Sequence, residues 1–197
     1  MENKSKMIID DSKFKYFLNA IHYCMWLHFL KFEEKNDKIF NCLFSQILKY
    51  FFTQKYKTNF YSNLGRVQND VAQFYNDKRS GFCISWASHW FGYAYSCYPA
   101  VISFVLFGVI LRFSDDLGNN IAIQILILAV PIVLCYIPLY RAVFFHDRYL
   151  EYFKEFEKKN TQWLNKWKKI TLIFCIGAII SIIFGITIAF VILGMIG

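Results

Sequence analysis

The chain has 197 residues and a formal net charge of +8, and 56% of its residues are hydrophobic and 20% aromatic. This composition is too apolar for an ordinary soluble domain of that length. Its six cysteines form no CxxC pair, so the sequence predicts neither a disulfide framework nor a metal site, and no cofactor-binding motif is evident.

Apolar residues recur at helical spacing in three segments of the amino-terminal part, over residues 12–32, 38–52 and 59–76. None of these segments alternates as a half-buried strand does. We therefore expect residues 1–88 to form a small helical module, which is cytoplasmic or lies against the membrane surface.

The stretch Tyr16–Leu30 is apolar enough to be considered as a membrane span. It is short for that role, however, and it contains Asn19, His22 and His28. The sequence favours a core or interfacial helix at this place.

Three longer apolar stretches follow, at Trp90–Leu111, Ile121–Tyr140 and Ile170–Gly197. None contains an acidic residue, a lysine, an arginine or a histidine, and each is about as long as a helix needs to cross ~30 Å of hydrocarbon. The sequence therefore predicts an all-α integral membrane protein with a three-span transmembrane region over residues 89–197.

The basic residues are distributed unevenly around these spans. Residues 1–89 contain 13 lysines and arginines and residues 141–169 contain 8, whereas the connector between the first two spans has Arg112 alone. The positive-inside rule then predicts a multi-pass protein of the cell inner membrane with a cytoplasmic amino terminus. Residues 141–169 become a cytoplasmic helical hairpin that extends the second and third spans, with a break near Lys159. Anionic lipid headgroups account for the positive charge without any nucleic acid.

Small side chains recur every four residues in the third span, at Gly177, Ser181, Gly185 and Ala189. This small-residue ribbon allows another helix backbone to approach closely. Two occupants are open at this stage: the ribbon either joins copies of the chain into an oligomer or packs against the chain's own first or second span.

Arg141 and His146 are separated by four residues, which is the Arg-x4-His spacing of HEPN-type ribonucleases. In such a pair the histidine moves a proton and the arginine holds phosphate charge. The motif is short, and the residue after the arginine, commonly polar in that family, is Ala142 here. We favour the alternative that Arg141 reaches the inner membrane interface and His146 begins the hairpin.

Two further patterns have structural alternatives that we favour. Lysines and aromatic residues interleave over Lys49–Tyr61, which suits either stacked RNA bases or an anionic membrane surface. Cys24 and His28 lie one helical turn apart near His22, but further zinc ligands at suitable spacing are lacking. We expect membrane or core packing in both cases, with no metal and no direct RNA binding.

The layout of Trp90–Gly197, together with Arg141 and His146, resembles the membrane accessory proteins of RNA-targeting type VI-B CRISPR systems. That group comprises a multi-span kind that dampens the RNA-guided nuclease, and a kind with a divergent HEPN motif that enhances defence and assembles into a membrane pore. The chain has spans like the first kind and an Arg-x4-His like the second. The resemblance implies a role in antiviral defence with an RNA-guided nuclease as partner.

The sequence as a whole leads us to expect a non-enzymatic, oligomeric membrane accessory or effector protein. We expect it to alter membrane permeability or to modulate an RNA-guided antiviral defence system. Two alternatives stay open. One is a membrane-tethered ribonuclease that uses Arg141 and His146, and the other is an adaptor whose amino-terminal module recruits a cytoplasmic protein.

Overall fold

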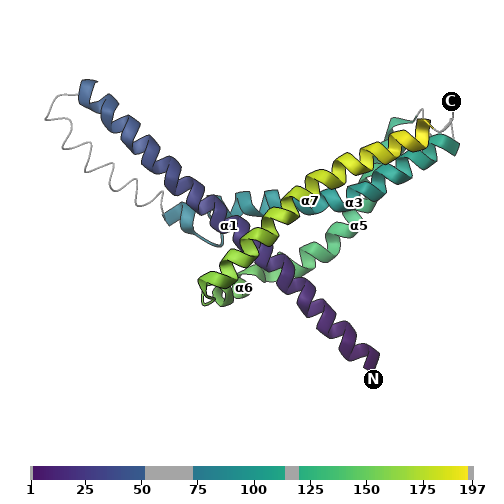
Figure 1. The fold of residues 1–197 in the computed structure, drawn as a ribbon, viewed down its shortest axis with the longest axis horizontal. Coiled ribbons are helices and arrows are strands. Elements are labelled where there is room, and N and C mark those ends of the chain that lie inside the picture. The colour runs from purple at the N-terminus through teal and green to yellow at the C-terminus, as the bar shows by residue number, and fades with distance from the viewer. Residues whose placement is uncertain (1, 52–72, 114–119, 195–197) are drawn as a thin grey trace. The chain divides into compact units, whose positions relative to one another are not determined.

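The computed structural model describes the backbone of residues 2–51, 73–113 and 120–194, and all of these residues lie in helices or in the turns beside them (Figure 1). The elements are α1 (Glu2–Phe51), α3 (Phe82–Phe113), α5 (Ile121–Val143), the 3-10 turn η1 (Phe145–Asp147), α6 (Tyr149–Phe156) and α7 (Thr161–Gly194). The prediction of an all-α fold is confirmed for these residues. Three of the described helices, α3, α5 and α7, are long and apolar enough to cross a membrane, as predicted. Their insertion and their orientation stay predictions.

Helix α1 runs without a break through the charged segment between the predicted helices at 12–32 and 38–52, so these two helices are one. Its 50 residues contain no proline and no glycine, the residues that interrupt helices most strongly. The charged segment Glu33–Lys38 consists largely of glutamate and lysine, which have good helix propensity. Most of the third predicted helix, at 59–76, lies outside the described residues.

The chain divides into two compact units. The span unit comprises residues 1–23 and 90–197, and the small unit comprises residues 24–89. The boundary between His89 and Trp90 lies one residue from the expected end of the amino-terminal module. Residues 1–23, however, group with the span helices, so α1 belongs to both units.

In the span unit, α3 and α7 approach each other closely at glycines. A Cβ atom built on Gly185 would lie 3.1 Å from the Val101 Cα and 3.0 Å from the ring of Phe104. A Cβ atom on Gly108 would lie 3.2 Å from the Cα of Ala189. These distances are shorter than ordinary van der Waals contacts, so the two helices are as close as they are because side chains are missing there.

Two tyrosines of α3 hydrogen-bond to the other spans. Tyr98 donates its hydroxyl to the Phe174 carbonyl of α7 at 2.7 Å, and Tyr95 donates to the Cys135 carbonyl of α5 at 3.3 Å. Hydrogen bonds between spans contribute about 0.6 kcal/mol each on average. We infer that these two bonds set the register of the helices more than they add to stability.

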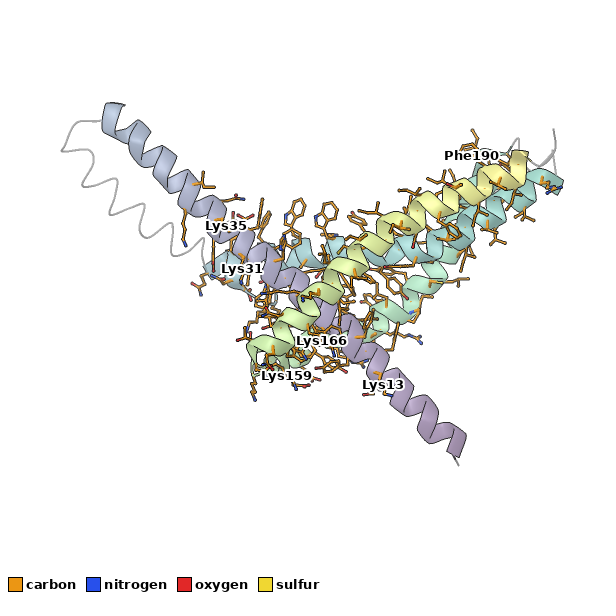
Figure 2. All side chains as sticks on the ribbon, viewed as in Figure 1. Lys13, Lys31, Lys35, Lys159, Lys166 and Phe190 are labelled. Atoms are coloured by element: carbon orange, nitrogen blue, oxygen red, sulfur yellow. The ribbon has the colours of Figure 1, made fainter. Side chains whose placement is uncertain are left out.

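Basic residues mark one end of the span unit. Lys166 lies toward the start of α7 and Phe190 near its other end, as Figure 2 shows. We call the end that holds Lys166 and the last turn of α5 the basic end. The predicted hairpin begins here, but its first leg is not a straight extension of α5. The backbone is left-handed at His146 (φ 56°) and Asp147 (φ 53°), between α5 and α6.

Candidate functional site

A cluster of aromatic rings joins α1 to the basic end of the span helices, and we call it the aromatic junction. Neighbouring rings have their centroids 4.9–6.4 Å apart, a separation at which aromatic pairs attract each other. The rings belong to Tyr16, His22, Tyr23, Phe91, Phe144, Tyr149, Phe153, Phe156, Trp163 and Trp167. Because Phe91 is on α3, Phe144 follows α5 and Trp163 is on α7, residues 16–23 of α1 contact all three span helices or their ends.

Asn19 satisfies a backbone group at the end of α5. The last carbonyls of a helix have no partner within the helix. Asn19 is 0% exposed, and its Nδ2 donates to the Ala142 carbonyl at 3.1 Å and to the Lys15 carbonyl of its own helix at 2.8 Å. Arg148 binds the preceding carbonyl of α5 in the same way: its Nη1 donates to the Arg141 oxygen at 2.9 Å. The end of α5 is therefore fixed by side chains from α1 and from the hairpin.

His22 lies at the centre of the aromatic junction. Its ring is 5.3 Å from Phe91, 5.5 Å from Phe144, and 5.4 Å from both Tyr149 and Phe153, measured between centroids. Its side chain is 0% exposed. Burial among these rings disfavours the charged imidazolium and lowers the pKa of His22 to about 3. The histidine is therefore neutral at physiological pH.

The small unit has an exposed aromatic pocket between its two helical parts. Phe29 and Phe32 of α1 and Phe82 and Trp86 of α3 line a hollow of about 150 Å³, together with Cys83 and Glu33. The centroids of Phe29 and Trp86 are 6.4 Å apart. Phe32 is 54% exposed and Trp86 43%, so rings line this pocket and remain accessible.

A tight turn fixes the chain's entry into α3. The carboxylate of Asp77 accepts hydrogen bonds from the Arg79 N–H at 2.9 Å and from the Ser80 hydroxyl at 2.5 Å. These bonds, that of the Ser80 hydroxyl first, lower the pKa of Asp77. A Cβ atom at Gly81 would collide with the Asp77 carbonyl oxygen, so the turn requires glycine at that position.

The small-residue ribbon of α7 faces α3 of the same chain at three of its four positions. Gly185 and Ala189 meet α3 as described above, and a Cβ atom on Gly177 would lie 2.7 Å from the Tyr98 hydroxyl. Ser181 is partly exposed. These contacts correspond to packing within the chain. Self-association through the same face stays a prediction, and it would have to displace α3.

The structure does not join the side chains of Arg141 and His146. Both are exposed, and within the described part of the chain no hydrogen bond links them. The ring of His146 lies 4.1 Å from that of Phe145, and its backbone is left-handed. A shared phosphodiester site is therefore not assembled in this conformation, and the ribonuclease alternative stays a prediction.

Two patterns singled out from the sequence remain: the zinc candidates Cys24 and His28, and the segment Lys49–Tyr61. Cys24 is buried whereas His28 is exposed, and the described residues contain no group of three or more metal-ligating side chains. The side chains of the Lys49–Tyr61 segment lie outside the described residues.

Sequence reasoning did not identify Asn19 and His22 as partners of the span helices. The available signal was their position, since polar residues at i and i+3 share one face of an otherwise apolar helix. From the sequence, their polarity indicates only that Tyr16–Leu30 is not a fourth span. Their partners were out of reach, because the Ala142 carbonyl lies 123 residues further along the chain.

Comparison of the chain with protein-family models, with curated proteins and with solved structures gave no match.

Proposed function

We propose that this protein is a non-enzymatic membrane accessory protein that works as an adaptor. The span unit holds the chain in the bilayer, and the small unit binds a soluble protein on the cytoplasmic side. One observation carries the proposal. Residues 16–23 of α1 are built into the aromatic junction with all three span helices, whereas the next residues of the same helix belong to a separate compact unit with an exposed aromatic pocket.

The pocket of the small unit has the chemistry of a protein-binding surface. Exposed aromatic rings around a hollow accept an apolar side chain of a partner, and buried aromatic contacts of this type dominate interface energies. Glu33 in its lining adds one negative charge that favours a basic neighbour on the partner. The resemblance to the type VI-B accessory proteins supports an RNA-guided nuclease as this partner and modulation of antiviral defence as the outcome.

Proximity labelling in cells tests the adaptor function. The full chain carries a promiscuous biotin ligase at its amino terminus, and the same ligase on an unrelated membrane anchor is the reference. We expect a soluble protein to be labelled selectively by the wild type and by Phe14→Ala. Labelling of the same protein should fall strongly in Phe32→Ala, because that ring lines the pocket.

Phe14 and Phe32 form a matched pair, since both are exposed phenylalanines on α1 and only Phe32 lines the pocket. Equal labelling by the two variants would place the partner elsewhere and contradict the role of the pocket. Labelling no different from that of the reference anchor would contradict the adaptor function itself.

A further inference from the structure

Helix α5 carries a groove that opens at the basic end of the span unit. The groove has a volume of about 370 Å³ and is lined by one face of α5 from Ile132 to Arg141 and by Phe145. This volume lies within the range of about 300–1,000 Å³ that is usual for small-molecule sites. At a rise of about 1.5 Å per residue, the lining face extends roughly 14 Å along the helix.

The lining of this groove changes in character along its length. The end toward the middle of the helix is aliphatic, with Ile132, Val133 and Ile137, and it continues through Tyr136 and Tyr140 to Arg141. An aliphatic trough that ends in tyrosines and an arginine matches an acyl chain that ends in an ester and a phosphate. Tyrosine rings and arginines are also the residues that lie at headgroup level in membrane proteins.

Positive charge is concentrated at the mouth of the groove. Arg141 lines the groove, and Arg148 donates through Nη1 to the Arg141 carbonyl at 2.9 Å, which places a second guanidinium beside the mouth. A guanidinium has five N–H donors and binds phosphate oxygens in pairs. His146 and Asp147 lie in the same turn, and Asp147 is the one acidic residue between Arg141 and Arg148. The mouth therefore has a net positive charge.

Of the three span helices, α5 is the one most open to its surroundings. None of its most apolar stretch is buried inside the structure, compared with 22% for α3 and 17% for α7. In a bilayer, a groove on such a helix meets lipid before anything else. The positive charge at the end of the groove favours anionic over zwitterionic lipids.

We propose that the α5 groove binds one anionic phospholipid, with an acyl chain along Ile132–Tyr140 and the phosphate on Arg141 and Arg148. The left-handed residues His146 and Asp147 directly follow Phe145 and lie between the two arginines in the chain. The proposal requires α5 to lie in the bilayer. It does not require the adaptor function or a partner for the small unit.

Photolabelling tests the lipid site in the purified full chain. The protein is reconstituted into phosphatidylcholine vesicles that contain a phosphatidylglycerol analogue with a photoreactive acyl chain, and the labelled peptides are mapped by mass spectrometry. We expect labelling between Ile132 and Phe145. Unlabelled phosphatidylglycerol should compete, whereas additional phosphatidylcholine and inorganic phosphate should not.

Two pairs of variants separate the site from ordinary contact with lipid. The double variant Arg141→Gln with Arg148→Gln should lower the labelling at least about tenfold, because the phosphate loses both of its charged hydrogen-bond donors, and Arg112→Gln should leave it unchanged. Ile137→Trp fills the groove and should block labelling. Leu134→Trp, an exposed position of α5 outside the groove lining, should not.

Several results would overturn the proposal. Equal labelling by a photoreactive phosphatidylcholine, or unchanged labelling in the double arginine variant and in Ile137→Trp, would show unspecific lipid contact. Crosslinks from the groove to a second copy of the chain in place of lipid would assign the groove to an oligomer interface. Circular dichroism and gel filtration confirm that each variant is folded, and the adaptor function is read separately from proximity labelling of the Phe32 variant.

Discussion

At the scale of single residues, two polar side chains distinguish α1 from an ordinary apolar helix. Asn19 and His22 are both 0% exposed. Burial of a polar side chain costs free energy unless it is hydrogen-bonded, and burial of a charged one costs more. The Nδ2 of Asn19 satisfies a carbonyl at the end of α5, and His22 is neutral within a shell of rings. Each makes the attachment of α1 sensitive to a small chemical change, which leads to two predictions.

Replacement of Asn19 tests the capping of α5. We expect Asn19→Asp to be the more harmful change, because a carboxylate cannot donate to the Ala142 carbonyl and its charge would be buried; breaking such a site costs about 3–5 kcal/mol. Asn19→Leu loses both hydrogen bonds that Nδ2 donates and should cost about 1–3 kcal/mol. Thermal unfolding in detergent measures both. Asn36→Asp, exposed on the same helix, is the control. A cost for Asn19→Asp no larger than that of the control would contradict the capping role.

His22 predicts a specific dependence of stability on pH. The pKa of His22 is about 3 in the folded chain and has its ordinary value of 6.5 in the unfolded chain. Between these two pH values the unfolded state therefore binds one more proton than the folded state. Stability is then fully present above about pH 6.5 and falls by about 1.4 kcal/mol per pH unit below it. Unfolding measured across this range should show a smaller slope for His22→Phe and His22→Gln than for the wild type. Identical slopes would mean that His22 is accessible to protons in the folded protein.

At the scale of elements, α3 is the helix on which the span unit is assembled. It presents Gly108 and Val101 to α7, and its tyrosine hydroxyls reach carbonyls of both α5 and α7. The small-residue ribbon of α7 thus has a partner within the chain. Large substitutions in the ribbon would disturb this packing first, so the loss of an oligomer in such variants would not by itself locate an oligomer interface.

Two glycines of α7 provide a test with opposite signs. Gly185→Ala places a Cβ atom about 3 Å from Val101 and Phe104 and should destabilise the span unit by about 1–3 kcal/mol. Gly194 has no atom within 4 Å of an added Cβ, so Gly194→Ala should be neutral or slightly stabilising through helix propensity. Thermal unfolding of the two variants in the same detergent gives the comparison. A Gly185→Ala protein as stable as Gly194→Ala would show that α3 and α7 are less close than described.

The elements of the span unit could be predicted from the sequence more fully than the contacts between them. Three long stretches without charge indicate three spans on their own, because the cost of burying charge in lipid is a local property. The continuity of α1 was missed, since the charged segment Glu33–Lys38 interrupts the apolar pattern without interrupting the helix. The aromatic junction was missed for another reason. Its pairs, such as His22 with Phe153, depend on how distant segments pack, and aromatic residues alone do not specify their partners.

At the scale of the whole molecule, the distribution of charge and the attachment of α1 agree with each other. The basic end holds the aromatic junction, the hairpin turn and the mouth of the α5 groove, and the positive-inside rule predicts that such an end faces the cytoplasm. Oligomer formation and a change in membrane permeability stay predictions. The sidedness of the membrane decides which of the surfaces are available to a soluble partner, so it is the property to establish first.

Two asparagines at opposite ends of the spans allow this test. Asn120 caps α5, where its Oδ1 accepts from the Ala122 N–H at 3.0 Å, and Asn160 caps α7, where its Oδ1 accepts from the Trp163 N–H at 2.9 Å. Each is replaced by cysteine in a chain whose native cysteines have been removed. A membrane-impermeant maleimide should label Asn120→Cys in intact spheroplasts, and it should label Asn160→Cys only after the membrane is permeabilised. The reverse pattern would place the basic end outside, where a cytoplasmic partner cannot reach it. Labelling of both cysteines in intact spheroplasts would contradict the crossing of α5 itself, since the residue before α5 and the hairpin after it would then lie on one side of the membrane.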